Sequence, residues 1–319
     1  MSSVDVIVPC YKYGNYLKEC VQSVLQQSQV DVRVLIIDDA SPDNTYDIAS
    51  SLAASDQRVS VVRHLQNRGH IETFNEGLDW ASGDYVLLLS ADDYLLPHCL
   101  ASSVSVMNEH SDVAFTYGRA VVLTPTDSRH PISHSQGEYF IEDGRDFIKR
   151  SGGQNLVPTP TAVVRTAIQK RVGGYRKELP HSGDMEMWLR LAVQGAVGRI
   201  DAFQAVYRLH SANMSLAYYC DGGFGDLVQK KAAIDSFFAT YATSPSILEL
   251  HPVLMRSLAT IAISAASMAF NDERRDISDK LAHLAREFSP GIERSIPWFK
   301  LTCKRQLPWL WRAIQRVTI

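Results

Sequence analysis

The 319-residue sequence is poor in cysteine, and the five cysteines form no recognisable framework. Cys10, Cys20, Cys99, Cys220 and Cys303 are odd in number, widely spaced and without a Cys-x-x-Cys pair. A disulfide scaffold needs paired cysteines and a structural zinc site needs closely spaced ones, so neither is expected here. Scattered reduced thiols are typical of the cytosol, and we expect a cytoplasmic location.

Long apolar runs and a strong charge of either sign are also absent. The longest apolar stretch, residues 257–270, has about fourteen residues and is too short to cross a bilayer. We expect no signal peptide, because a core strand begins by Val4. The net charge of −3 gives no argument for a nucleic-acid partner. No G-x-G-x-x-G turn follows the first strand, which excludes a nicotinamide-dependent dehydrogenase.

The sequence does contain short apolar runs that alternate with helical segments. The runs typical of buried strands are Val4–Val8, Val32–Ile37, Val59–Val62 and Tyr85–Leu89. Between the first two, apolar residues recur at the spacing of one helix face, and further helices are predicted over residues 44–54 and 70–80. Strands that alternate with helices predict an α/β fold with a parallel sheet covered on both faces.

Carboxylates directly follow two of these runs. Asp39 comes after the second strand, and Asp92 and Asp93 come after the fourth. Ligands of open α/β sheets bind outside the carboxyl ends of the strands, so these side chains should converge although more than fifty residues separate them. Burying paired carboxylates is costly unless a positive charge meets them, and a Mg²⁺ or Mn²⁺ ion on a diphosphate would do so. The alternative for an isolated Asp-Asp is a loop that caps the next helix.

The order and spacing of several short motifs resemble those of family 2 glycosyltransferases with the GT-A fold. In chain order the motifs are Val6-Ile-Val-Pro-Cys-Tyr11, Ile36-Ile-Asp-Asp-Ala-Ser-Pro-Asp-Asn-Thr45, Asn67-Arg-Gly69, Ser90-Ala-Asp-Asp93, Val172-Gly-Gly-Tyr175, Gly183-Asp-Met-Glu-Met-Trp188 and Tyr207-Arg-Leu-His210. The resemblance covers roughly residues 3–215. Ser90 departs from the commonest acidic pattern, because many members carry another Asp there.

The resemblance implies a Rossmann-like, mostly parallel sheet with flanking helices. It also implies metal-dependent, inverting transfer of a hexosyl or N-acetylhexosaminyl group from a nucleoside-diphosphate sugar, with UDP-sugars favoured. The acceptor would be a hydroxyl of a saccharide or lipid-linked saccharide, in the assembly of cell-surface polysaccharide. The cofactor would be Mn²⁺ or Mg²⁺.

Roles for individual residues are implied in the same way. The carboxylate at Asp39 would bond the nucleotide base, Asp92 the ribose and Asp93 the metal ion. His210 would approach the metal and the diphosphate. The other residues implied to bind the nucleotide sugar are Pro9, Tyr11, Arg68 and Arg208.

A helix predicted over residues 183–193 carries the candidate base. Asp184 lies at its amino end, where a carboxylate suits both a cap and the helix dipole, and a rigid helix also holds a base in place. The resemblance assigns Asp184 as the catalytic base. Glu186 is the competing carboxylate, but its spacing directs it elsewhere around the helix. One base and no candidate covalent nucleophile predict a single, inverting displacement.

Two alternative functions remain at this stage. A non-catalytic sugar-nucleotide-binding module would be expected to lack Asp184 or Asp93, and both are present. A nucleotidyltransferase would be expected to carry a glycine-rich, basic phosphate loop near the amino terminus, and residues 9–14 do not form one.

Two further features of the sequence are a polar loop and the division of the chain into domains. A polar loop over residues 124–137 is predicted to be a mobile flap or an acceptor contact. We expect a domain over residues 1–220 and a helical region over residues 221–319, with helices at 227–241, 247–270 and 276–288.

The last stretch, residues 291–319, has six Lys or Arg and one Glu. Its tryptophans and cations are Trp298, Trp309, Trp311, Lys304, Arg305, Arg312 and Arg316. This composition fits an interfacial helix on the inner face of an anionic membrane. It equally fits a terminal helix docked on the protein or on a second copy in a homo-oligomer.

Overall fold

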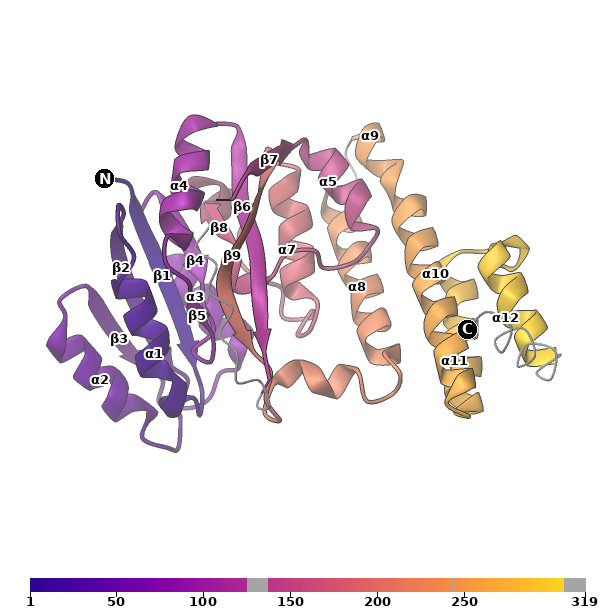
Figure 1. Ribbon diagram of the computed structural model, residues 1–319, viewed down its shortest axis with the longest axis horizontal. Coiled ribbons are helices and arrows are strands. Elements are labelled where there is room, and N and C mark those ends of the chain that lie inside the picture. Colours follow the sequence, from indigo (N-terminus) through magenta and orange to yellow (C-terminus); the bar gives the residue numbers. More distant parts are fainter. Residues whose placement is uncertain (125–136, 242–243, 307–319) are drawn as a thin grey trace. The chain divides into compact units, whose positions relative to one another are not determined.

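The computed structural model describes residues 1–124, 137–241 and 244–306. They fold into two compact units (Figure 1). The sheet unit contains residues 1–147 and 155–213, and the helical unit contains residues 148–154 and the chain from residue 214 onward. The predicted boundary lay at residue 220. The structure divides at 213, and an internal segment joins the helical unit.

The first half of the sheet is parallel, as predicted. Its strands lie in the order β3-β2-β1-β4, with Val4 opposite both Val32 and Tyr85. One helix connects each strand to the next strand in sequence, as in a doubly wound sheet. The elements are β1 (Ser3–Cys10), α1 (Gly14–Leu25), β2 (Asp31–Asp38), α2 (Thr45–Ser55), β3 (Val59–Arg63), α3 (His70–Trp80) and β4 (Tyr85–Leu88).

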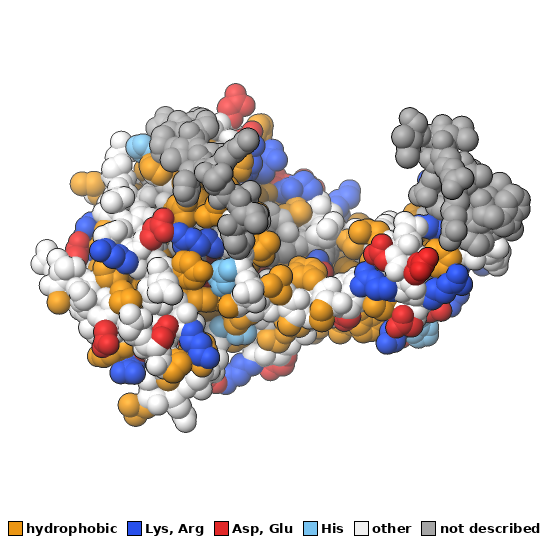
Figure 2. Space-filling model, turned by 60° about the horizontal axis from the view of Figure 1, so that its bottom comes forward, with side chains coloured by type: hydrophobic (Ala, Val, Ile, Leu, Met, Phe, Trp, Pro, Cys, Tyr) orange, Lys and Arg blue, Asp and Glu red, His pale blue; other side chains and the backbone are white. Residues whose placement is uncertain are grey.

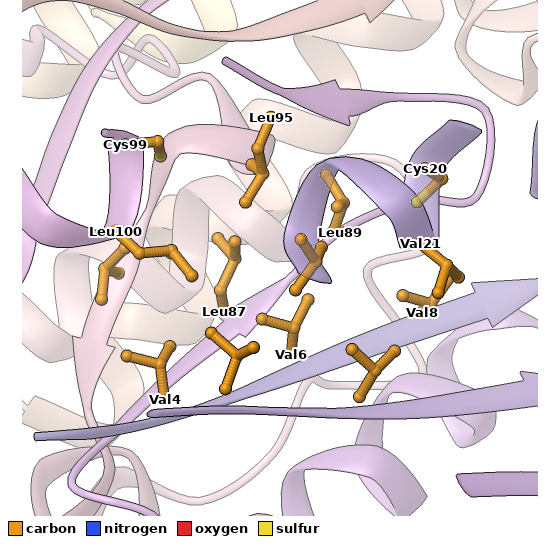
Figure 3. Close-up of a cluster of buried hydrophobic side chains, with 14 of the residues drawn as sticks. Val4, Val6, Val8, Cys20, Val21, Leu87, Leu89, Leu95, Cys99 and Leu100 are labelled. Atoms are coloured by element: carbon orange, nitrogen blue, oxygen red, sulfur yellow. The ribbon is translucent and has the colours of Figure 1, made fainter. Parts of the chain in front are cut away.

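The core of the sheet unit lies on both faces of β1. Val4, Val6 and Val8 project to one face, where they meet apolar side chains of β4, α1 and α4 (Cys99–Glu109) (Figure 3). Ile7 projects to the other face, against Gly77 of α3. Each fully buried side chain of this kind contributes about 1.5–3 kcal/mol of transfer free energy. Burial on both faces explains why residues 6–10 of β1 form a continuous apolar run instead of alternating with polar residues.

The second half of the sheet is mixed. β8 pairs antiparallel with β4 and β6, β6 pairs parallel with β9, and β5 and β7 pair antiparallel with β9. The predicted α/β fold with flanking helices is confirmed, and its sheet is parallel in the first half and mixed in the second. The remaining elements of the sheet unit are β5 (Tyr94–Leu95), β6 (Val113–Leu123), β7 (Tyr139–Glu142), η1 (Thr159–Thr161), β8 (Val163–Arg165), α6 (Thr166–Val172), α7 (Gly183–Ala192) and β9 (Ala196–Arg208). Helix α5 (Gly144–Ser151) begins in the sheet unit, and its residues from 148 onward belong to the helical unit. Most of the predicted polar loop, residues 125–136, lies outside the described residues.

The helical unit is built around α10. Its elements are η2 (Met214–Tyr218), α8 (Phe224–Tyr241), α9 (Pro245–Leu248), α10 (Leu250–Asn271), α11 (Arg275–Phe288), η3 (Ile292–Arg294) and α12 (Ile296–Gln306). Leu254, Leu258 and Ala262 of α10 are buried at helical spacing. The Ser278 hydroxyl of α11 donates to the Ala266 carbonyl of α10 at 2.7 Å, which fixes the register of the two helices.

The apolar segment of the helical unit is longer than the sequence pattern indicated. Residues 245–271 form a stretch long and apolar enough to cross a membrane by length and composition, and 44% of its most apolar part is buried. A buried core helix passes the same test of composition.

The basic tail is partly folded into the helical unit. Lys304 is 3% exposed, and its ammonium group donates to the Ser267 carbonyl (2.9 Å) and hydroxyl (2.8 Å). Arg305 donates to the Ser278 hydroxyl and pairs with Asp279. These contacts of Lys304 and Arg305 favour the alternative of a terminal helix docked on the protein, and membrane contact of the tail stays a prediction. The predicted membrane residues Trp309, Trp311, Arg312 and Arg316 lie outside the described residues.

The described surface carries both signs of charge. Figure 2 shows Lys and Arg side chains interspersed with Asp and Glu over the visible face. This distribution agrees with the small net charge of the chain.

Candidate functional site

Three neighbouring parallel strands end at one edge of the sheet and define the site. The backbone N–H of Asp39 donates to the Cys10 carbonyl at 2.9 Å, which holds the end of β2 beside the end of β1. On the other side of β1, the N–H of Leu89 donates to the Ile7 carbonyl at 2.9 Å. The predicted convergence of the strand-end carboxylates follows from this pairing.

The first two predicted residues lie at the end of β1. Pro9 is buried within the strand, whereas Tyr11 is 39% exposed just beyond it. The Lys12 ammonium lies 5.0 Å from the centre of the Tyr11 ring. Lys12 has a positive φ of 63°, and its N–H donates to the Ser41 hydroxyl, so the chain turns sharply here.

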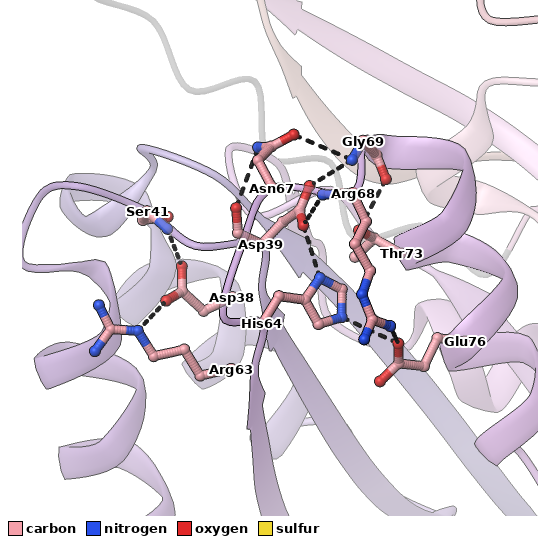
Figure 4. A network of polar contacts seen from close by, with 10 residues as sticks. All are labelled: Asp38, Asp39, Ser41, Arg63, His64, Asn67, Arg68, Gly69, Thr73 and Glu76. Atoms are coloured by element: carbon pink, nitrogen blue, oxygen red, sulfur yellow. Dashed lines mark hydrogen bonds and ion pairs between the residues drawn. The ribbon is translucent and has the colours of Figure 1, made fainter.

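Asp39 holds the loop that contains Arg68 (Figure 4). Its Oδ1 accepts the N–H of Arg68 at 2.7 Å, and its Oδ2 accepts the N–H of Gly69 at 2.9 Å. Gly69 has a φ of 85°, a conformation that favours glycine and that turns its N–H toward the carboxylate. The Asn67 side chain donates to the Asp39 carbonyl at 3.1 Å. The Asn-Arg-Gly motif is thus bound to the end of β2 by one carboxylate.

A buried histidine completes this network. His64 is 4% exposed; its Nδ1 lies 2.7 Å from Asp39 Oδ1 and its Nε2 lies 3.0 Å from Glu76 Oε2. Glu76 also accepts a hydrogen bond from the Arg68 guanidinium at 2.9 Å. Both ring nitrogens face carboxylate oxygens, an arrangement that two N–H donors satisfy and a neutral imidazole satisfies only in part. His64 therefore couples the loop carboxylate to α3.

Asp92 and Asp93 lie side by side in a buried turn, 4% and 2% exposed. Burial, and next the charge of Asp92, raises the pKa of Asp93 well above its usual range. Arg208 at the end of β9 binds both residues, because its N–H donates to Asp93 Oδ1 (2.9 Å) and its Nη1 donates to the Asp92 carbonyl (2.6 Å). The guanidinium lies over the rings of Tyr16 (5.1 Å) and Tyr94 (4.7 Å). Arg208 thus binds the turn that presents the carboxylates.

His210 contacts Asp92, the first residue of this pair. Its Nδ1 accepts the N–H of Ala212 at 3.2 Å, so Nε2 carries the hydrogen and donates to Asp92 Oδ2 at 3.1 Å. The imidazole stacks on Tyr16 at 5.4 Å and meets the edge of Tyr13 at 5.6 Å. The other oxygen, Asp92 Oδ1, is buried and has no hydrogen-bond partner.

These groups suit a hard divalent cation that also binds a phosphate. Two adjacent carboxylates supply oxygen ligands, and Asp92 Oδ1 is an unpaired buried acceptor, which is unfavourable without a positive partner. Within the described ranges no cluster of three His, Cys, Asp or Glu side chains is arranged to hold a metal alone. An ion such as Mg²⁺ or Mn²⁺, if bound here, would take one or two carboxylates and complete its shell with water and substrate phosphate.

Asp184 lies in the first turn of α7 and is held from two sides. Its Oδ2 accepts hydrogen bonds from the Asn155 amide (2.8 Å) and the Thr159 hydroxyl (3.0 Å), and its Oδ1 accepts the N–H of Met185 (2.8 Å). Burial raises the pKa of Asp184, and these hydrogen bonds oppose the rise. The stacking of Trp188 on Phe115, with ring centres 5.7 Å apart, anchors the helix to the core.

Glu186 belongs to a different environment. It is fully buried and pairs with the guanidinium groups of Arg190 (2.8 Å) and Arg176 (2.9 Å). The sequence prediction that it is directed away from Asp184 agrees with these contacts. A buried carboxylate between two arginines is a structural ion pair and is unavailable to a substrate hydroxyl.

The predicted residues thus form two contact networks and a separate group. Arg68 joins Asp39, and Arg208 and His210 join Asp92 and Asp93; the contacts between described residues do not connect Asp184 to either network. Sequence reasoning missed the partners that hold these side chains: His64, Glu76, Tyr16, Tyr94, Asn155 and Thr159. The repeated tyrosines after the first strand were a usable signal, whereas the polar segment 155–159 gave none.

The sequence profile of Glycosyl transferase family 2 matches residues 5–171, which is more than half of the chain. A glycosyltransferase of Nostoc sp., itself uncharacterized, is 28% identical over 225 residues, 66% of each chain. The hyaluronan synthase of Pasteurella multocida is 23% identical over 284 residues, which cover 82% of this chain but 28% of the synthase. The first three curated relatives are covered over 66%, 45% and 28% of their own lengths.

Solved structures share the fold at low sequence identity. S. aureus TarS in complex with UDP-GlcNAc superposes with a TM-score of 0.60 and 16% identity, over 90% of this chain and 92% of that one. The mannosyltransferase PcManGT from Pyrobaculum calidifontis, in complex with GDP-Man and Mn²⁺, superposes with a TM-score of 0.53 and 15% identity, over 89% and 86%. The GT-A-like sheet with a helical carboxyl-terminal region is therefore established.

Proposed function

Because the chain belongs to glycosyl transferase family 2, we propose that it transfers a sugar from a nucleoside-diphosphate sugar to an acceptor hydroxyl. One arrangement of carboxylates carries the proposal. The buried pair Asp92 and Asp93 lies at the sheet edge where Asp39 also lies, and Asp92 Oδ1 has no hydrogen-bond partner. A further carboxylate, Asp184, has a pKa raised by burial and lies on a helix anchored to the core.

The nucleotide would lie along the carboxyl ends of β2, β1 and β4. Asp39 and Arg68 would meet the base, with Pro9 and Tyr11 beside it, and Asp92 would meet the ribose. The Asp39 carboxylate already accepts three hydrogen bonds and has about four lone-pair sites, so one remains for a base N–H. Names of similar proteins support UDP-sugars as the first donors to test, since TarS is seen with UDP-GlcNAc.

A divalent cation would be held by Asp93, with His210 and the diphosphate completing its surroundings. When bound, it supplies Lewis-acid stabilisation of the leaving diphosphate. Arg208 would keep the carboxylate turn in place and add positive charge near the leaving group. His210 would have to exchange its hydrogen bond with Asp92 for the incoming ligand.

The transfer would be a single displacement. Asp184 accepts the proton of the acceptor hydroxyl, the oxygen attacks the anomeric carbon, and the bond to the diphosphate breaks, which inverts that carbon. Polysaccharide synthases among the relatives support a hexosyl or N-acetylhexosaminyl group as the sugar and a saccharide as the acceptor.

Replacing Asp184 by Asn tests this function. The amide keeps the shape but loses basicity, so we expect release of nucleoside diphosphate from UDP-sugars, with water or saccharides as acceptors, to fall by about 10²-fold or more. Calorimetry should show nearly unchanged UDP binding. The exposed Asp79 provides a matched control, because D79N makes the same chemical change on the surface. Equal rates in D184N and the parent enzyme would remove Asp184 from the mechanism.

The nucleotide itself is tested separately. A panel of UDP, GDP and other nucleoside diphosphates with Mn²⁺ should raise the melting temperature for one base, since a ligand stabilises the folded state by RT ln(1 + [L]/Kd). No stabilisation by any member of the panel would contradict nucleotide-sugar binding.

A further inference from the structure

The Asp184 carboxylate is asymmetrically occupied. Each carboxylate oxygen has about two lone-pair sites. At Oδ2 both are used, by the Asn155 amide at 2.8 Å and the Thr159 hydroxyl at 3.0 Å. At Oδ1 only the N–H of Met185 is bound, at 2.8 Å. One lone pair of Oδ1 therefore remains free of protein donors among the described contacts.

The two donors to Oδ2 come from one short, well-braced segment. The Asn155 side-chain oxygen accepts the N–H of Val157 at 3.2 Å, which fixes the orientation of its amide. Thr159 begins the short helix η1, and Thr161 of the same helix binds the Gly118 backbone of β6. The segment is thus held by a hydrogen bond within itself and by hydrogen bonds to the sheet, and neither Asn155 nor Thr159 belongs to α7.

We propose that Asn155 and Thr159 are positioning residues that clamp Oδ2 of Asp184 and leave Oδ1 as the atom that receives the acceptor proton. This inference rests on the proposed function of Asp184 as the base. In the step, the acceptor O–H bond breaks and its proton passes to Oδ1. The acceptor oxygen forms a bond to the anomeric carbon, and the nucleoside diphosphate departs with the electron pair of the broken C–O bond.

The clamp has two physical effects. It stops rotation of the carboxylate about its Cβ–Cγ bond, so the free lone pair keeps one direction, as proton transfer over hydrogen-bond distance requires. It also stabilises the ionised form, because hydrogen bonds to a carboxylate oppose the rise in pKa caused by burial. Loss of either donor should therefore misdirect the base and raise its pKa further.

The test uses two conservative losses and one rescue. Thr159→Val and Asn155→Ala each remove one donor to Oδ2, whereas Thr159→Ser keeps the hydroxyl. Thr166→Val is the matched control, because it makes the same chemical change at a buried threonine whose hydroxyl has no hydrogen-bond partner among the described residues and no contact to Asp184. Melting temperatures of all four variants identify any that fail to fold, and T159S keeps the comparison possible if T159V is unstable.

The first measurement is independent of transfer activity. In protein labelled with ¹³C at aspartate Cγ, the Asp184 signal is assigned by its loss in D184N and titrated by NMR. We expect its midpoint to move to higher pH in T159V and N155A and to stay near the parent value in T159S and T166V. Unchanged midpoints in T159V and N155A, or an equal shift in T166V, would overturn the clamp.

The second measurement follows nucleoside diphosphate release from the donor that the panel selects. We expect kcat to fall about tenfold in T159V and in N155A with little change in KM for the donor, since a hydrogen bond to a charged group is worth about one order of magnitude. The acidic limb of the rate profile should move upward with the NMR midpoint. A parent enzyme inactive with every donor would count against the proposed function, while the NMR titration would still decide the clamp.

Discussion

At the residue scale, the carboxylates of the site differ in how far the protein satisfies them. Asp39 accepts three hydrogen bonds through its side chain, whereas Asp92 Oδ1 accepts none. Asp93 accepts one, from the N–H of Arg208. Asp39 is therefore stable without a ligand, while Asp92 and Asp93 gain most from a cation.

Substitution of Asp93 by Asn should separate stability from binding. Because burial raises the pKa of Asp93, the folded state penalises its ionised form, and that penalty is present at neutral pH and absent below the unfolded pKa. In the absence of metal, D93N should therefore melt at a higher temperature than the parent protein at neutral pH. Its Mn²⁺-dependent affinity for nucleoside diphosphate should fall by about 100-fold, since even indirect partners of metal ligands contribute 10–100-fold.

Differential scanning calorimetry without Mn²⁺ measures the melting temperature. Titration calorimetry with a nucleoside diphosphate, with and without Mn²⁺, measures the affinity. The D79N variant serves again as the surface control. A D93N protein that keeps the Mn²⁺-dependent affinity would exclude Asp93 as a metal ligand.

The carboxylates could be predicted from the sequence and their partners could not, for a physical reason. Asp39, Asp92 and Asp93 follow apolar runs, so the strand pattern alone places them at one sheet edge. His64 and Thr159 matter only through contacts with residues 25 positions away, and no local periodicity records such contacts. The sequence left the docking of the basic tail open for the same reason, because Ser267 meets Lys304 only through tertiary packing.

At the element scale, the contact between α3 and β1 sets how closely a helix can cover the sheet. A Cβ added to Gly77 would lie 2.2 Å from Ile7 Cγ2, so the helix packs at a distance that only glycine permits. This proximity also holds Glu76, the preceding residue, against His64.

Gly77→Ala should destabilise the protein in spite of the better helix propensity of alanine. Overpacking a close contact costs about 1–3 kcal/mol, against about 1 kcal/mol gained from propensity. Gly225→Ala in α8 is the control, because its added Cβ would have ordinary contacts at 3.5–3.6 Å, and it should be neutral or stabilising. Urea unfolding compares the two; equal midpoints would show that α3 can move away without loss.

The helices and strands of the first 90 residues were predictable because each has the period of its own type. β5 and β8 were not, since two and three residues are too few to show a period. Their pairing, antiparallel to longer strands, is what makes the second half of the sheet mixed.

At the scale of the whole molecule, the tail beyond Gln306 remains a candidate for membrane binding. Lys304 and Arg305 are held by the helical unit, but Arg312 and Arg316 follow it in sequence with two tryptophans. A chain that ends at Gln306 keeps every described contact of α12.

The full chain should sediment with anionic vesicles at low salt, and the chain ending at Gln306 should not. The two additional arginines contribute about 1 kcal/mol each near an anionic surface, or roughly 30-fold together, and salt should release the protein by screening. Vesicles of neutral lipid are the control. Equal sedimentation of both chains would place the membrane contact elsewhere or exclude it.

The discontinuity of the helical unit restricts how this chain could exchange parts with its relatives. Residues 148–154 belong to that unit, and a Cβ on Gly153 would lie 3.0 Å from Ile234 Cδ1 of α8. A recombination event at a single point near residue 213 would therefore join this short segment from one parent to helices from another. Functional chimeras that exchange the whole helical unit should require three crossovers, one on each side of the segment and one near residue 213, so the two units are expected to be inherited together.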